Sequence, residues 1–141
     1  MKEYTIREIS KLFGLPASTI RYYEDEGILT DVARTASGQR IFTDGHVNRI
    51  KTICCFKNTG MTIAELKQFF AYETDESVHL DDILALLRQR RDCAAAQIRQ
   101  LKENYAHVLR KIHYYEDIRE SLTDHLPLPR WEDYKERTYD E

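Results

Sequence analysis

The sequence predicts a mainly α-helical protein, in which a small N-terminal domain with one β-hairpin is followed by a single long helix. Three patterns indicate this fold class. Capping-box sequences before apolar residues at helical spacing mark short helices in the first 75 residues. A glycine-containing stretch between residues 32 and 42 has the composition of a hairpin. Apolar residues at alternating steps of four and three then continue from residue 80 to residue 122, as in a coiled coil.

The composition is typical of an ordered protein of the reducing cytoplasm. Charged residues make up 32% of the chain and hydrophobic residues 42%, and no apolar run approaches the length of a membrane span. Three cysteines, two of them adjacent, do not form a disulfide framework. The first 60 residues hold nine Lys/Arg and seven Asp/Glu, whereas the remaining residues hold twelve and seventeen. Only the N-terminal part is therefore basic, which is compatible with nucleic-acid binding there.

Two short helices are expected at the N-terminus. Thr5 and Glu8 have the spacing of a capping box, and Gly14 supplies a stop for the helix that follows. Pro16 favours the start of a second helix, which we expect to run to about Gly27. Because the connection is only a few residues long, the two helices must pack against each other at an angle. This is the outline of a helix-turn-helix.

The second helix contains the adjacent tyrosines Tyr22 and Tyr23, which point about 100° apart on a helix. Tyr23 shares an inward face with Ile20, so Tyr22 must lie outward. The outward face also holds Ser18, Arg21 and Asp25. Arg21 can reach a phosphate or a guanine edge, and the Tyr22 hydroxyl can donate to a phosphate. The alternative is a surface arginine beside a half-buried tyrosine, with no partner for either.

Residues 32–42, VARTASGQRIF, predict a hairpin whose turn contains Gly38. Arg34 and Arg40 are expected opposite each other on its two arms. Next to a helix-turn-helix, such a hairpin resembles a wing that contacts phosphates. In isolation, a solvated hairpin with two surface arginines fits the pattern equally well.

Two further helices should complete the N-terminal domain. We expect Asp44 to cap the third helix, which ends near Gly60, and Thr62 with Glu65 to form a second capping box for the fourth. The apolar residues of these helices are Val47, Ile50, Ile53, Cys54, Ile63, Leu66, Phe69 and Phe70. The polar stretch YETDES, residues 72–77, is interpreted as a linker or hinge.

A coiled-coil helix from about Val78 to Leu122 is indicated by thirteen heptad positions, eleven of them apolar. We call these positions the seam: Leu80, Leu84, Leu87, Arg91, Ala94, Ile98, Leu101, Tyr105, Val108, Ile112, Tyr115, Arg119 and Leu122. Nothing else in the sequence is large enough to cover this stripe, so we predict a homodimer. Pro127 and Pro129 should prevent the helix from continuing, and the charged tail after them either folds back or stays loose.

The segments YTIREISKLFGLPASTIRYYEDEGIL, RTASGQRIF and NTGMTIAELK precede the long helix in this order. This arrangement, over residues 3–122, resembles the MerR family of transcriptional regulators. The resemblance implies a winged helix-turn-helix DNA-binding domain over residues 1–75. It also implies an antiparallel coiled-coil dimerisation helix over residues 76–122, here followed by a C-terminal tail, residues 123–141. The family's mechanism is distortion of a pseudo-palindromic promoter operator in response to a signal.

Under this resemblance, the partners are double-stranded promoter DNA, a second copy of the chain and RNA polymerase at the promoter. The residues expected to contact DNA are Ser18, Thr19, Arg21, Tyr22, Arg34 and Arg40. No cofactor, metal or membrane is expected. An enzyme is the first rival class, but the sequence has no Gly-rich phosphate loop, no nucleophile with an evident base and no metal-ligand cluster. A coiled-coil protein-interaction module is the second rival, and it leaves the arginines unexplained.

The signal is open to two interpretations. The segment from Cys55 to Gly60, a cysteine followed by two residues and Asn-x-Gly, resembles the reactive-cysteine region of members that respond to aldehydes, electrophiles or nitrosative stress. Cys54 is expected to pack on the apolar face, whereas Cys55 is turned toward its edge. Packing alone is the simpler role for both thiols. A small organic ligand at the dimer end is the other option, held by Tyr105, Tyr114, Tyr115 and Trp131 unless these aromatics only pack the seam and tail.

Overall fold

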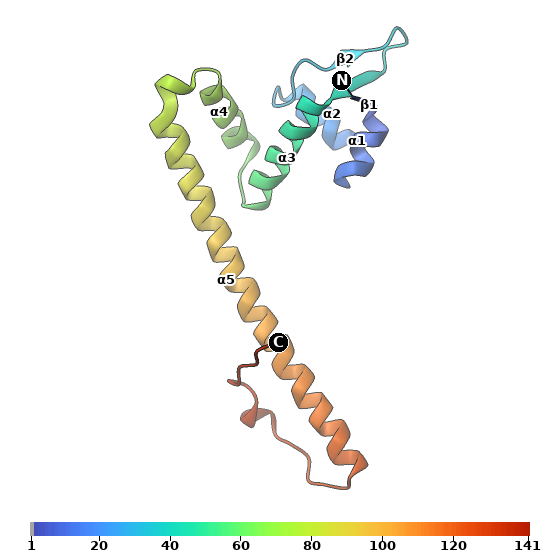
Figure 1. The fold of residues 1–141 in the computed structure, drawn as a ribbon, viewed down its shortest axis with the longest axis vertical. Coiled ribbons are helices and arrows are strands. Elements are labelled where there is room, and N and C mark those ends of the chain that lie inside the picture. Colours follow the sequence, from blue (N-terminus) through green and yellow to red (C-terminus); the bar gives the residue numbers. More distant parts are fainter. Residues whose placement is uncertain (1) are drawn as a thin grey trace. The chain divides into compact units, whose positions relative to one another are not determined.

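A computed structural model describes residues 2–141 as two compact units that divide after Cys93. The elements in chain order are β1 (Glu3–Tyr4), α1 (Ile6–Phe13), α2 (Ala17–Asp25), β2 (Ala33–Arg34), β3 (Arg40–Thr43), α3 (Asp44–Asn58), α4 (Ile63–Glu73), α5 (Glu76–Thr123) and a 3-10 turn (Trp131–Asp133) (Figure 1). The long helix α5 contributes residues 76–93 to the first unit and residues 94–123 to the second. The predicted mainly α-helical fold class is confirmed.

The first two helices begin and end largely where local sequence signals predicted. Thr5 accepts a hydrogen bond at 3.1 Å from the backbone N–H of Glu8, whose carboxylate accepts one at 3.3 Å from the N–H of Thr5. Gly14 ends α1 in the left-handed conformation, with φ of 64°. Pro16 is the N-cap of α2. The only difference is that α2 ends at Asp25, two residues earlier than expected.

A three-stranded antiparallel sheet with the order β1-β3-β2 replaces the simple hairpin expected from the sequence. The hairpin register is as predicted, because Arg34 pairs directly with Arg40. The strand β1 was missed: its two residues are too few to show an alternating pattern. It forms because Tyr4 pairs with Phe42 and its hydroxyl donates to the Asp44 carboxylate at 2.8 Å.

The cap of α3 differs from the prediction by one residue. Thr43, not Asp44, is the N-cap, because the extended backbone of β3 continues through Thr43 before the helix begins. The backbone N–H of Thr43 donates to Nδ1 of His46 at 2.9 Å, so the imidazole takes the place that Glu or Gln occupies in a capping box. Asp44 is the first helical residue and accepts from Tyr4 instead.

The connection between α4 and α5 is shorter than the linker predicted over residues 72–77. Only Thr74 and Asp75 separate the two helices. At the other end of α4, the predicted N-cap role of Thr62 is confirmed, because its hydroxyl accepts a 3.2 Å hydrogen bond from the Glu65 N–H. The backbone leaves the helical region at His79, with φ of −112° and ψ of 17°, so the regular part of α5 follows this residue. The change of direction is therefore confined to a two-residue turn and one kink.

The hydrophobic core of the first unit lies between the helices and the sheet. It contains Ile9, Ile20, Tyr23, Ile28, Leu29, Phe42, Val47, Ile50, Ile53, Met61, Leu66, Phe69 and Phe70. Every helix from α1 to α4 contributes at least one of these side chains, and each large one stabilises the fold by roughly 1.5–3 kcal/mol when buried. Arg90 of α5 is also buried, and it donates to the Thr59 carbonyl at 3.1 Å in the turn between α3 and α4.

The second unit is formed by the C-terminal half of α5 and the tail that packs back on it. Tyr134 is buried, and its hydroxyl donates to the Asp117 carboxylate at 2.5 Å, which raises the pKa of the phenol. Near the chain end, Tyr139 stacks on the His113 ring with centroids 3.8 Å apart. Within residues 2–141, no helix is both long and apolar enough to span a membrane.

Candidate DNA interface

The helix α2 separates its two tyrosines as predicted. Ile20 and Tyr23 are 0% and 3% exposed in the core, and burial raises the pKa of the Tyr23 phenol. Tyr22 is 44% exposed and Arg21 is also exposed. The core contacts therefore fix the rotation of α2 about its axis so that a guanidinium and a phenol lie together on the outer face.

The N-terminal turn of α2 is also suited to an anion. Ser18 is exposed and Thr19 is half-buried, and the N-cap residue Pro16 provides no side-chain cap, while the Thr19 N–H already donates to the Pro16 carbonyl at 3.0 Å. Unpaired N–H groups at a helix N-terminus attract phosphate oxygens. The predicted contacts of these two residues with DNA stay predictions, but both residues lie where a phosphate could be bound.

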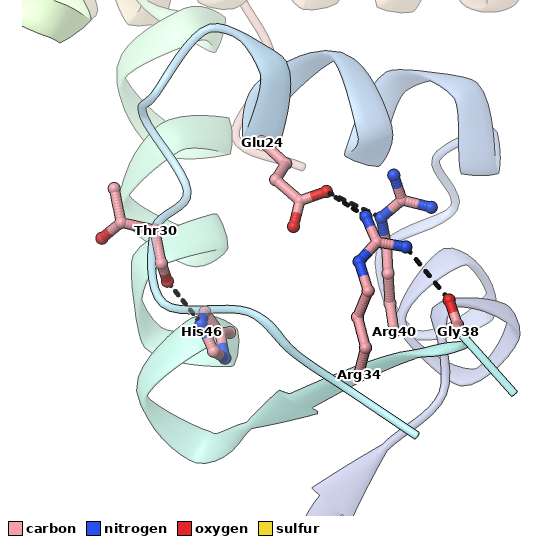
Figure 2. Close-up of polar contacts among 6 residues, drawn as sticks. All are labelled: Glu24, Thr30, Arg34, Gly38, Arg40 and His46. Atoms are coloured by element: carbon pink, nitrogen blue, oxygen red, sulfur yellow. Dashed lines mark hydrogen bonds and ion pairs between the residues drawn. The ribbon is translucent and has the colours of Figure 1, made fainter. Parts of the chain in front are cut away.

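The two wing arginines converge on one carboxylate, that of Glu24 on α2 (Figure 2). Arg40 donates from Nε to Glu24 Oε1 at 2.7 Å, and Arg34 Nη2 lies 3.5 Å from the same oxygen. Arg34 also donates from Nη1 to the Gly38 carbonyl at 3.1 Å. The sequence predicted that both arginines lie in the wing, but it did not predict Glu24 between them. The one signal in the sequence that could have indicated this contact is the presence of an acidic residue, Glu24, in a helix that is otherwise expected to contact phosphates.

The segment after α2 is held to α3 by two polar contacts that sequence reasoning missed. Because Nδ1 of His46 accepts from Thr43, its Nε2 bears the proton and donates to the Thr30 carbonyl at 2.7 Å (Figure 2). Arg49 donates from Nε to the Ile28 carbonyl at 3.0 Å, and its guanidinium carbon lies 3.5 Å from the centre of the Phe70 ring. Burial lowers the pKa of Arg49. These contacts fix the path of the chain from the helix to the wing.

The adjacent cysteines of α3 differ in exposure, as expected. Cys55 is exposed, whereas Cys54 is half-buried and burial raises the pKa of its thiol against the opposing charge of Lys57. Among residues 2–141, no group of three or more His, Cys, Asp or Glu side chains is arranged to hold a metal ion. The exposure of Cys55 agrees with the prediction, while its reactivity stays a prediction.

Three of the four aromatic residues considered for ligand binding, Tyr114, Tyr115 and Trp131, form ring contacts in the second unit, each involving Tyr114. The Tyr114 ring lies 5.4 Å from that of Trp131 and 5.2 Å from that of Tyr134. The Lys111 ammonium lies 3.7 Å from the centre of the Trp131 ring. These contacts fit the packing alternative for Tyr114 and Trp131, whereas Tyr105 and Tyr115 remain exposed.

Comparison with known proteins places this arrangement in a family. Residues 4–73 match the family described as "MerR HTH family regulatory protein", and residues 47–111 match "MerR, DNA binding". A crystal structure of a MerR family transcriptional regulator from Bacillus thuringiensis is 30% identical, with a TM-score of 0.66. That match covers 79% of this chain and 98% of the other. The chain belongs to the MerR family of transcriptional regulators.

Other MerR-family proteins extend the likeness along most of the chain. The structure of HiNmlR, described as a MerR family regulator lacking the sensor domain and bound to promoter DNA, has a TM-score of 0.77 and 27% identity. It covers 91% of this chain and 100% of HiNmlR. The regulator AdhR of Bacillus subtilis is 38% identical over 60% of this chain and 63% of its own length. As a MerR-family protein, the chain is a DNA-binding transcriptional regulator and not an enzyme.

Proposed function

We propose that this MerR-family protein binds a pseudo-palindromic promoter operator as a homodimer and distorts the DNA in response to a signal. The observation that carries the proposal is the outward face of α2, where Arg21 and Tyr22 lie on the same unit as the wing. In the proposal, residues 1–75 bind DNA, residues 76–122 form an antiparallel coiled coil with the partner copy, and residues 123–141 are a tail.

The exposed seam of α5 supports the homodimer. Its exposed large apolar side chains are Leu80, Leu84, Ile98, Leu101, Tyr105, Val108, Ile112, Tyr115 and Leu122. Leu87 packs against the core of the first unit instead, so the uninterrupted run of exposed apolar seam residues lies in the second unit, from Ile98 to Tyr115. Such a run is unfavourable in water, and its heptad spacing is the pattern by which a second helix covers it. The tail residues Tyr134 and Tyr139 contact Asp117 and His113, which do not belong to the seam. The seam residue Tyr105 donates from its hydroxyl to the Glu141 carbonyl at 2.9 Å, so a partner helix would meet the tail at this one position.

Two DNA-binding domains in one dimer provide the basis for operator distortion. Each domain binds one half-site. The distance between the two domains therefore determines how far apart the two half-sites must lie on the DNA. DNA of a different twist or curvature has to deform, at a free energy that depends on its sequence. A relative of similar fold was solved on promoter DNA, which supports a promoter as the target. RNA polymerase then meets a promoter whose geometry the regulator has changed.

The test is a nuclease footprint on the promoter region of the chain's own gene. The proposal expects protection of two symmetric half-sites between the promoter elements, with enhanced cleavage at the centre where the DNA is bent or untwisted. Half-sites outside the promoter spacer, or protection without central distortion, would indicate simple repression instead. Loss of binding between about 50 and 200 mM salt by orders of magnitude is expected of a protein that contacts several phosphates.

For the signal, the proposal assigns the reactive thiol to Cys55. The thiol is exposed on the last turn of α3, and this turn is joined to α5 through the bond from Arg90 to Thr59. An adduct on Cys55 therefore lies close in sequence to a contact between the DNA-binding helices and the dimerisation helix. Transfer from an S-nitrosothiol forms an Sγ–N bond on Cys55, breaks the S–N bond of the donor and releases the donor as a thiol.

Cys55 is expected to be modified before Cys54 and Cys93 at neutral pH. The raised pKa of Cys54 leaves less thiolate there, and thiolate is the nucleophile, so Cys54 should need a higher pH to react. Intact-mass and peptide-mass measurements after mild S-nitrosothiol or aldehyde treatment give the order of modification. Cys55→Ser should abolish the first adduct, whereas Cys54→Ser should leave it unchanged. Modification confined to Cys93 rules out this assignment.

A further inference from the structure

We propose that Glu24 is a specificity-determining residue, which lowers the affinity of the wing for DNA of any sequence relative to its affinity for the operator. The inference deepens the proposed operator binding and rests on it. It concerns a carboxylate in a surface that is otherwise suited to phosphates. Figure 2 shows Glu24 pointing from α2 to the two wing arginines.

The two arginines are bound to Glu24 to different degrees. Arg40 is 19% exposed and forms the short bond of 2.7 Å from Nε. Arg34 is 47% exposed, lies at 3.5 Å from the same oxygen, and directs its other terminal nitrogen to the Gly38 carbonyl. The single negative charge of Glu24 is therefore shared between the two guanidinium groups, mostly with Arg40, and the cluster keeps a net charge of +1. Arg34 is the guanidinium that a DNA phosphate can take over.

Glu24 also fixes the wing to α2. Arg34 and Arg40 are paired across β2 and β3, so a contact to either holds both strands. With Glu24 in place, the wing reaches a phosphate at one fixed position relative to α2. That position is productive when Arg21 and Tyr22 occupy the operator groove in register. On other DNA, the wing cannot adapt its position without breaking the pair with Glu24.

These two effects act in the same direction on specificity. Non-specific complexes depend almost entirely on phosphate contacts, so a wing of reduced positive charge and fixed position weakens them most. In the operator complex, base contacts from α2 supply additional affinity, and a preorganised wing loses less conformational freedom on binding. A wing that is not held by Glu24 would gain phosphate contacts on DNA of any sequence. Glu24 therefore increases the ratio of operator affinity to non-specific affinity.

The test compares Glu24→Gln with the wild type in titrations of operator and scrambled duplexes at several salt concentrations. Glu24→Gln is expected to bind scrambled DNA about 3- to 10-fold more tightly, with a slope of log K against log salt that is steeper by about one phosphate contact. Operator affinity should change by less than about threefold, so the specificity ratio falls. An unchanged ratio and slope overturn the inference.

A matched control is Glu3→Gln, which makes the same charge change elsewhere in the first unit. Glu3 is exposed on β1 and belongs neither to the outward face of α2 nor to the wing contact. If the effect is general electrostatics, both variants will raise affinity for both duplexes by similar factors, which contradicts the inference. If Glu24 acts through the wing, only Glu24→Gln changes the ratio.

A double-mutant cycle with Arg34→Gln identifies the group through which Glu24 acts. In the background that retains Glu24, Arg34 is partly neutralised, so its removal should reduce the slope of log K against log salt by less than one. In the Glu24→Gln background, the same removal should reduce it by about one, the value for a free arginine. Equal reductions in both backgrounds overturn the inference, and Arg34→Gln alone still tests it if Glu24→Gln unfolds. Failure of the wild type to bind operator would instead contradict the function proposed above.

Discussion

Replacing Arg21 with alanine is expected to weaken operator binding by about 1–3 kcal/mol and to relax specificity at one base position of each half-site. The core contacts of Ile20 and Tyr23 orient α2 so that Arg21 points outward next to Tyr22. A guanidinium there can donate two parallel hydrogen bonds to a guanine edge, and alanine removes both without disturbing the core. The measurement is a gel-shift or anisotropy titration of the operator and of single-base variants.

The result distinguishes base contact from phosphate contact. If Arg21 reads a base, the loss should be largest on the native operator and nearly absent on the variant lacking that base pair. A uniform loss on all duplexes, with a salt slope reduced by about one, assigns Arg21 to a phosphate instead. Arg88→Ala is the control, because Arg88 is an exposed arginine on α5 outside the α2 face. Unchanged affinity in Arg21→Ala removes it from the interface.

Replacing Leu101 with lysine is expected to convert the proposed dimer to monomers at micromolar concentration. Leu101 is 69% exposed at the middle of the seam, so it meets the middle of the partner helix when the two seams overlap over their full length, in either orientation. Two lysines would be brought together and removed from water at this point. An uncompensated buried charge weakens an association by about 3–5 kcal/mol, which is a factor of roughly 100 to 4,000 in the dissociation constant.

Sedimentation equilibrium over a range of concentrations measures this effect. Leu128→Lys is a matched control, because Leu128 is 58% exposed but lies in the tail after the helix. It should leave the dimer intact. Operator affinity should fall with the dimer in Leu101→Lys, since a monomer binds only one half-site. A wild-type chain that is monomeric, or a Leu101→Lys variant that stays dimeric, contradicts the predicted seam.

The features that the sequence predicted well depend on residues close together in the chain. The capping box of Thr5 and Glu8, the stop at Gly14 and the inward position of Tyr23 all follow from spacings of one to four residues. The extent of the long helix α5 was predicted from an equally local signal, because each step of its apolar spacing is three or four residues. Such patterns fix the elements and their buried faces before any tertiary contact is known.

The features that were missed depend on contacts between distant residues. Tyr4 forms a strand only because Phe42 and Asp44 lie beside it, about forty residues later. Thr43 rather than Asp44 caps α3, since the cap position follows from where the preceding strand ends. The bond from Arg40 to Glu24 spans sixteen residues, and no periodicity predicts it. The candidate site was therefore predicted by residue type, but not by its internal pairing.

Trp131, which packs against Tyr114 in the second unit, is the single tryptophan of the chain. Excitation near 295 nm therefore selects a fluorophore in the C-terminal unit, and the DNA-binding unit contributes no indole signal. An operator titration followed by this emission reports on a part of the chain remote in sequence from α2. A change in the intensity or wavelength of this emission would show that DNA binding alters the surroundings of Trp131, and no added label is needed.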